Sequence, residues 1–341
     1  MVEGVFMRLA ESLRKNIMET AVGSILNKFK VKKRRVVLFF EDISANYVKM
    51  CENAGYSEKI HSIGQKWGFM CTKTLVPPSL NLLSPILFLN KIVRGVWINI
   101  GLMDDFKVTK KDDIIKLEIR NDAITRIIGK NNFAIGCFSG ILNALFKSKI
   151  YCVKASQSKN LSKYIFKTTT EPVNFDFKTK KKYEKLNTLP SLKGFTLKDS
   201  IRNGLFQIKK NKIYFRKKII CNSENTIFHL FSNYNILLDK ISEISYNYFN
   251  DIIEKESSVD SKLNLLKTLL QTMGWGILTI IRKEKEIIIE IKNPTYGFQK
   301  EKDNWNFLIR VIEGYLWTIN RNFRINNIKE NFKYLKIIYS L

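Results

Sequence analysis

The residue types that could perform chemistry are few in this sequence, and their spacing forms no familiar catalytic pattern. The two histidines, His61 and His229, lie far apart, which argues against a histidine-rich metal site and against histidine acid–base chemistry. The sequence contains no GxSxG, P-loop, HExxH or GxGxxG motif. The five cysteines occur singly, without a CxxC pair, at Cys51, Cys71, Cys137, Cys152 and Cys221. We therefore predict a non-catalytic protein without a metal or cofactor.

The remaining candidates for chemistry have simpler explanations. Asp104-Asp105 and Asp112-Asp113 are adjacent pairs, and neighbouring residues of a strand point to opposite faces, so turns explain them better than a shared acid–base site. Cys137 lies on the apolar side of a predicted helix without a basic neighbour in sequence, which predicts an unreactive thiol. An odd number of scattered cysteines is typical of a reducing compartment, so we expect a cytoplasmic protein.

The charge of the chain is its strongest compositional signal. It has 58 Lys and Arg against 31 Asp and Glu, a formal net charge of +27. Residues 141–220 alone hold 20 Lys or Arg against 4 Asp or Glu. Such an excess favours a polyanionic partner: nucleic acid, an anionic membrane surface or an acidic protein. The candidate contacts are Lys30, Lys32, Lys33, Arg34, Arg35, Lys178, Lys180, Lys181, Lys182, Arg216, Lys217 and Lys218.

Aromatic residues are interleaved with this basic region and could stack on single-stranded bases. They are Tyr151, Tyr164, Phe166, Phe175, Phe177, Tyr183 and Phe195. The alternative is that the alternating aromatic residues face a core while the lysines keep the surface solvated. No helix-turn-helix, zinc-finger or RNP-like pattern indicates a groove-reading module.

Two apolar segments raise the question of a membrane. Residues 1–34 carry one apolar stripe followed by a basic cluster, which fits either a membrane-surface helix or a helix docked on a protein core. Residues 80–100 are the best candidate span, but they contain Lys91, Arg94 and Pro85. Because charges near the centre of a span are costly, we predict a buried helix there.

The chain also repeats itself. LEIRN at 117–121 and IEIKN at 289–293 are separated by 172 residues, and Gly101 faces Gly274 at nearly the same offset. NNFAIGCFSGIL (131–142) likewise faces NWNFLIRVIEGYL (304–316) at an offset of 174. Chance in a Lys- and Ile-rich chain is the alternative, but several blocks in one order favour an internal duplication. In both copies of the phrase the Leu or Ile residues should face a core and the charged residues the other side.

The elements expected around these blocks follow one order in both halves. In the first half we predict a strand at 36–40, followed by helices at 43–54 and 57–72. In the second half we predict a hairpin at 207–220, followed by helices at 224–233 and 236–254. A third helix is expected at 82–99 in the first half and at 261–272 in the second. Two strands should follow it, at 105–109 and 113–120 in the first half and at 276–282 and 285–292 in the second. Each half ends with a helix and one strand. These are expected at 132–146 and 162–167 in the first half, and at 305–319 and 334–340 in the second. The predicted fold class is α+β, with tandem units at 35–167 and 205–341, each a small antiparallel sheet packed with several helices, and a basic linker at 168–204.

Patterned glycines connect these units to a known family. They are Ile63-Gly64 with Gly68, the helix entry Phe133, Gly136 and Gly140, and Met273-Gly274-Trp275-Gly276. This arrangement resembles the 4-vinyl reductase domain family, which is related to core subunits of TRAPP vesicle-tethering complexes. The resemblance implies an apolar cavity for a small hydrophobic ligand, or a dimerising interaction module with a protein partner. Because duplicated domains often reproduce the contact of an ancestral dimer, we also predict that the two units pack as a pseudo-dimer.

The sequence departs from that family in one respect. Its domains commonly end in cysteines that can hold a metal, whereas the corresponding stretches 153–166 and 324–338 contain no cysteine or glycine. We therefore expect no metal site. Aromatic residues beside the predicted helices could line the implied cavity, although such residues are more often plain core. They are Trp67, Phe69, Trp97, Phe138, Tyr248, Trp275, Trp305 and Trp317. The sequence thus predicts a regulatory ligand-binding protein, with a polyanion-binding adaptor as the alternative.

Overall fold

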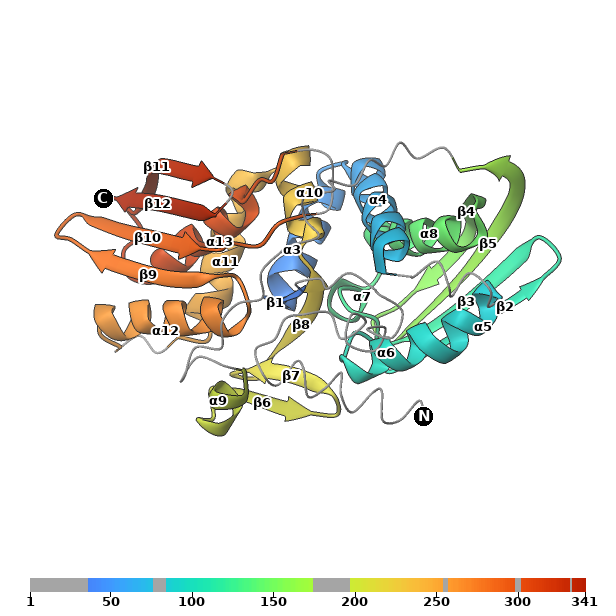
Figure 1. Cartoon of the computed structure of the whole chain (residues 1–341), viewed down its shortest axis with the longest axis horizontal. Coiled ribbons are helices and arrows are strands. Elements are labelled where there is room, and N and C mark those ends of the chain that lie inside the picture. Colours follow the sequence, from blue (N-terminus) through green and yellow to red (C-terminus); the bar gives the residue numbers. More distant parts are fainter. Residues whose placement is uncertain (1–35, 76–83, 174–196, 254–256, 298–301, 332) are drawn as a thin grey trace.

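A computed structural model describes residues 36–75, 84–173, 197–253, 257–297, 302–331 and 333–341 (Figure 1). The predicted amino-terminal helix, its basic cluster at Lys30–Arg35 and the lysines at 178–182 lie outside these residues. The N-terminal half, residues 36–173, contains β1 (Val36–Phe40), α3 (Glu41–Asn53), α4 (Ser57–Leu75), α5 (Pro85–Phe88), η3 (Leu89–Val93), α6 (Arg94–Asn99), β2 (Asp105–Lys111), β3 (Ile114–Arg120), α7 (Thr125–Ile128), α8 (Asn132–Phe146), β4 (Ser148–Gln157) and β5 (Leu161–Pro172).

The C-terminal half, residues 197–341, repeats much of this order. It contains α9 (Leu197–Arg202), β6 (Phe206–Lys209), β7 (Lys212–Phe215), β8 (Lys218–Glu224), α10 (Thr226–Tyr234), η5 (Leu238–Lys240), α11 (Ile241–Asn250), α12 (Val259–Thr272), β9 (Ile277–Arg282), β10 (Glu286–Lys292), α13 (Asn306–Leu316), β11 (Arg324–Asn331) and β12 (Tyr334–Ser340). Helices and antiparallel sheets are mixed along the chain, which confirms the predicted α+β class.

The two larger sheets have the same topology. One has the strand order β2-β3-β5-β4 and the other β9-β10-β12-β11. In each, the first two strands form a hairpin, one long helix (α8 or α13) follows, and the last two strands form a second hairpin. Figure 1 shows these sheets on opposite sides of the molecule, with β1 and β8 between them.

The repeated phrases occupy equivalent strands of these sheets. LEIRN lies in β3 and IEIKN in β10, and the predicted inward residues Leu117, Ile119, Ile289 and Ile291 are all buried. The asparagine that ends each phrase, Asn121 or Asn293, has a left-handed φ of about 50° and donates its N–H to the loop between the last two strands. The prediction of which residues face the core is confirmed.

Matching backbone details extend beyond the phrases. Gly101 and Gly274 both have positive φ, and each follows a helix that ends in the same pair of hydrogen bonds: the glycine N–H to the carbonyl three residues back, and the next N–H to the carbonyl five back. That pattern is a Schellman motif, which favours glycine because it needs a left-handed residue. The glycines of the alignment therefore end equivalent helices.

Strands β4 and β11 were not predicted. Each half was expected to end in a single strand, but β4 and β11 pair with β5 and β12 as outer edges. Both contain an extra residue at the same place, Val153 between Cys152 and Lys154, and Asn326 between Ile325 and Asn327. The bulge interrupts the alternation on which sequence prediction depends, and the strands are largely exposed, so neither carries a clear apolar pattern.

The central sheet, β1-β8-β7-β6, joins the two halves. The predicted hairpin at 207–220 is wrong in detail, because the segment forms three strands and the third, β8, pairs antiparallel with β1. The expected linker also differs: β5 continues to Pro172, and α9 begins at Leu197, whose side chain is buried in the core. The predicted helix at 82–99 is three short segments with a π-helical turn at η3, and Leu87 within it is 46% exposed.

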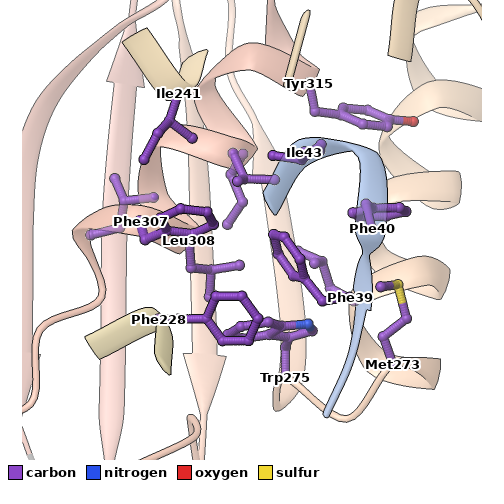
Figure 2. Packing of buried hydrophobic residues seen from close by; sticks show 14 of the residues in the cluster. Phe39, Phe40, Ile43, Phe228, Ile241, Met273, Trp275, Phe307, Leu308 and Tyr315 are labelled. Carbon is purple, nitrogen blue, oxygen red and sulfur yellow. The ribbon is translucent and has the colours of Figure 1, made fainter. Parts of the chain in front are cut away.

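The largest core lies around β1. Phe39 packs against Phe228, Trp275 and Phe307 at ring-centroid distances of 4.4, 5.7 and 5.6 Å (Figure 2). Phe40 contacts Phe249 at 4.9 Å. Side chains from the first strand of the chain thus fill the core of the C-terminal half, while a smaller core lies between α8 and the sheet β2-β3-β5-β4.

Helices α4 and α8 cross at unusually short range. A Cβ atom added to Gly140 would lie 2.0 Å from the Gln65 carbonyl oxygen, and Gly64, Gly68 and Gly136 are equally tight against the facing backbone. Gly314 of α13 has the same relation to the Ser242 carbonyl oxygen of α11, at 2.1 Å. Four of the patterned glycines, Gly64, Gly68, Gly136 and Gly140, are therefore the points where the backbones of α4 and α8 touch.

Replacing one of these glycines should destabilise the protein even though alanine is the better helix former. We expect Gly140→Ala to lower the free energy of unfolding by roughly 1–3 kcal/mol, the usual cost of overpacking. Urea denaturation would measure this loss. The exposed α12 variant Asn264→Ala serves as the control and should change stability by less than about 0.5 kcal/mol. A Gly140→Ala protein as stable as the native chain would contradict the close crossing.

Candidate polyanion-binding surface

Of the predicted basic residues that the structure describes, Arg216 and Lys218 are engaged within the molecule, whereas Lys217 is exposed. Arg216 and Lys217 form the turn between β7 and β8, both with positive φ. The Arg216 guanidinium donates to the Ile252 carbonyl oxygen at 2.5 Å, and the Lys218 ammonium lies 3.4 Å from the Asp42 carboxylate. This turn is therefore part of the packing between the central sheet and its neighbours.

The eight aromatic residues proposed to line a cavity are divided between the two cores. Five belong to or pack against the large core around β1: Trp67, Tyr248, Trp275, Trp305 and Trp317. Trp97 and Phe138 belong to the smaller core, and Phe69 is buried outside both. Trp97 and Phe138 meet at 6.1 Å in the N-terminal half. Trp275 packs under β1 and donates its indole N–H to the Leu38 carbonyl oxygen. Others have their own surroundings: Trp67 beside Phe133, Trp305 beside His229, Tyr248 beside Phe40, and Trp317 beside Arg321 and Arg324. Their positions give the ligand-site prediction no common location.

A different set of basic residues does gather in one place. The side of the sheet β2-β3-β5-β4 that faces away from α8 carries exposed Lys and Arg from all four strands, and we call it the basic face. Its cations are Lys107, Lys111, Lys116, Arg120, Lys154, Lys163 and Lys167.

The alternation of the strands produces this face. Phe106, Val108, Ile115 and Leu117 are buried with Phe138 of α8, so the residues between them point outward. The strand register then places outward residues in rows, the first being Lys111, Ile114, Lys167 and Tyr151 and the second Thr109, Lys116, Ile165 and Lys154. Rows lie roughly 7 Å apart and strands about 5 Å apart, so the cations form a lattice.

Few acidic groups oppose these cations. Lys163 lies 3.5 Å from Glu118, and Lys167 lies 3.6 Å from Asp113. Lys107, Lys111, Lys116 and Lys154 form no ion pair with any residue in the described part of the chain. Exposed ion pairs contribute little and leave the cations able to exchange partners. The basic face thus keeps a net positive field.

The equivalent face of the C-terminal sheet is far less basic. At offsets of 172 or 173 the seven cations correspond to Thr279, Lys283, Ile288, Lys292, Asn327, Lys336 and Ser340. The cross-strand pair is kept, because Lys336 lies 2.9 Å from Glu290 and Lys163 lies 3.5 Å from Glu118. The surrounding positive charge is not kept, although the strands of the two sheets match. Charge on the first sheet is therefore not required by the fold.

A buried ion pair holds this sheet against the centre of the molecule. Glu41, at the start of α3, is fully buried and pairs with Arg126 of α7, whose Nε donates to Glu41 Oε1 at 2.7 Å. Arg126 also donates to the Gly101 carbonyl oxygen at 3.0 Å. Glu41 further accepts the N–H of Ile124, whose φ of 69° is strained for a β-branched residue. The pair therefore fixes the loop before β2 and the loop after β3.

Asp122 lies beside this pair. Burial raises the pKa of its carboxyl to about 7, and nearby Glu41 acts in the same direction, against Arg126 and a hydrogen bond from Thr125. Thr125 in turn accepts from Asn131, which caps α8 through the N–H of Ala134. The sequence offered no sign of the Glu41–Arg126 pair beside Asp122, because that pair joins segments 85 residues apart.

The basic face was also missed by sequence reasoning. Its signal in the sequence is lysine at alternate positions in the two predicted strands and in 162–167. These cations form a lattice only when the unpredicted strand β4 is in place. Among the predicted stacking residues, Tyr164 and Phe166 are buried in the core, as the alternative reading held. Tyr151 is 44% exposed on β4, and the other four lie outside the described residues.

Comparisons with known protein families, curated proteins and solved structures find no match. Within the described ranges, no helix has the length and apolarity needed to cross a membrane. The same ranges contain no group of three or more His, Cys, Asp or Glu side chains placed to hold a metal ion. The resemblance to the 4-vinyl reductase domain family stays a prediction.

Asp122 should make stability depend on pH. A carboxyl whose pKa is higher in the folded state than its ordinary 3.9 stabilises the fold fully below about pH 4 and loses that contribution as pH rises towards 7. We expect Asp122→Asn to remove this loss, so that its free energy of unfolding relative to the native chain rises by up to about 4 kcal/mol between pH 4 and 8. Urea titrations across that range would measure it. Asp112→Asn, in the exposed β2–β3 turn, should give the native profile, and a parallel profile for Asp122→Asn would refute the assignment.

Proposed function

We propose that the chain contains two copies of one α+β unit, packed as a pseudo-dimer about the β1–β8 pair. Several features recur at offsets of 172–173 and support this proposal: the strand order, the left-handed asparagines, the Schellman glycines, the bulges and the Glu–Lys cross-strand pair. An antiparallel pair of equivalent strands is the contact that a twofold axis produces.

Pseudo-dimeric packing has a direct test. A protease site inserted between β5 and α9 would allow the chain to be cut into its two halves. Because β1 pairs with β8 and buries Phe39 and Phe40 in the C-terminal core, the cut fragments should elute together in size-exclusion chromatography and separate only in denaturant. The uncut chain carrying the insertion is the control. Two fragments that elute apart without denaturant would overturn the proposal.

We further propose that the protein is a non-catalytic nucleic-acid-binding protein, and that the basic face is its binding surface. The observation that carries this proposal is the gathering of seven exposed cations on one sheet face while the matching face keeps three. A cation lattice of this kind suits the repeated phosphates of a nucleic acid, whose bound counterions are released on contact. The net charge of +27 would assist association over a distance.

The ligand-binding function implied by the family resemblance stays a prediction. Its eight aromatic residues are distributed over the cores of both halves, so no particular observation favours it over nucleic-acid binding.

Removing the four basic-face lysines without an ion partner should weaken binding selectively. The variant replaces Lys107, Lys111, Lys116 and Lys154 with Gln, and its expected affinity for a fluorescent oligonucleotide is at least tenfold lower at physiological salt. The slope of log K against log salt should fall by roughly 2–3, because each single-strand phosphate contact contributes about 0.7. Anisotropy titrations across a salt series would measure both quantities.

The control removes the same charge from the other sheet. Lys285, Lys292, Lys329 and Lys333 are exposed on or beside the C-terminal sheet, and their replacement with Gln should change affinity and slope little. Equal losses in the two variants would mean that net charge alone drives binding, and the proposed surface would be wrong. The face would be assigned to a membrane instead if the native chain floated with anionic liposomes, the basic-face variant did not, and oligonucleotides did not bind.

A further inference from the structure

We infer that the basic face is built for single-stranded nucleic acid, with Tyr151 as the stacking residue. The inference rests on the proposed function and adds the class of nucleic acid and the residue that selects it. Tyr151 is 44% exposed and shares an outward row with Lys111, Ile114 and Lys167. An aromatic ring therefore lies among phosphate-binding cations at the outer edge of the sheet.

The β-bulge is what brings Tyr151 into this position. Residues three apart in a regular strand point to opposite faces, yet Tyr151 pairs with outward Lys167 and Lys154 pairs with outward Ile165. The extra residue Val153 changes the phase between them, so both side chains lie on the basic face. Without the bulge, either the ring or the ammonium group would turn towards α8.

The edge beside Tyr151 is open for a bound strand. At the opposite edge, the Asn90 side chain bonds both the N–H and the carbonyl of Val108 in β2, at 2.9 and 2.7 Å, and so covers that strand. Among the described residues no strand pairs with the outer side of β4. A base can therefore approach the Tyr151 ring from the side of the sheet.

The C-terminal sheet lacks this combination. Its bulge is identical, but the residues equivalent to Tyr151 and Lys154 are Arg324 and Asn327. Arg324 is occupied with the Arg321 and Phe323 carbonyl oxygens and with the Trp317 ring. The same backbone thus presents a ring among cations in the N-terminal half alone.

These features favour single strands over the alternatives. A duplex presents phosphates but keeps its bases stacked inside, so an exposed ring next to the cations would add nothing to its binding. An anionic membrane surface would attract the lysines but has no base to stack on the ring, and Ile114 and Ile165 are half-buried between exposed lysines, so they present no apolar side to the lipid. Unstacked bases are the groups that use both the cations and the ring.

The test compares ligands and Tyr151 variants of the full chain. The ligands are a 12-nucleotide single strand, a duplex and heparin, measured by anisotropy or by competition at fixed salt. We expect the native protein to prefer the single strand, and Tyr151→Ala to weaken that binding roughly 5- to 100-fold, the range for loss of one base–aromatic stack. Tyr151→Phe should retain single-strand affinity, while the salt slope, duplex binding and heparin binding should not change in either variant.

Ile281→Ala on β9 of the C-terminal sheet is the matched control, since Ile281 is also apolar and, at 42%, about as exposed as Tyr151. It should leave single-strand affinity unchanged, and unfolding midpoints would verify that each variant is folded. If single strand and duplex bind equally and Tyr151→Ala has no effect, the single-strand inference fails while the basic face stands. If the native chain binds none of the three polyanions, the proposed function fails and this inference with it.

Discussion

The fold depends on one short strand, Val36–Phe40, being enclosed on every side. One edge of β1 forms the ladder with β8, and on the other edge Leu38 donates to the Met273 carbonyl oxygen and accepts from the Trp275 indole. Its side chains Phe39 and Phe40 are almost completely buried. Burial of each phenyl ring contributes on the order of 2–3 kcal/mol. Because no backbone group of Leu38 is left for water, the halves of the chain are held together by hydrogen bonds as well as by apolar contact.

The two sheets divide structural and functional requirements between their faces. The inner faces agree in strand order, buried residues, bulges and one helix-crossing glycine, Gly140 or Gly314, which are features that packing demands. The outer faces disagree: lysines and a tyrosine on one correspond to isoleucine, asparagine and arginine on the other. A shared scaffold with different surfaces is how one fold accommodates different partners. The basic face is therefore the place where function, rather than folding, accounts for the choice of residues.

Sequence reasoning reached the fold where the evidence was local and periodic. The strands with LEIRN and IEIKN, the helix Asn132–Phe146 and the class were predicted correctly because alternation and helical spacing were intact. Strands β4 and β11 were missed because a bulge breaks their alternation and their sides are exposed. The Glu41–Arg126 pair and the lattice of lysines require strands and loops from distant segments to be in place, and no single stretch of sequence contains that information.

The β1–β8 ladder also determines how late in synthesis the fold can be completed. Residues 36–40 leave the ribosome long before residues 220–224, so the first strand has no partner until most of the chain has been synthesised. Until then, Phe39 and Phe40 and an unpaired strand edge are exposed to other chains. Contacts of such long sequence separation also slow the closing step of folding. Nascent chains of this protein therefore have a long period of vulnerability to aggregation, which ends only when β8 emerges.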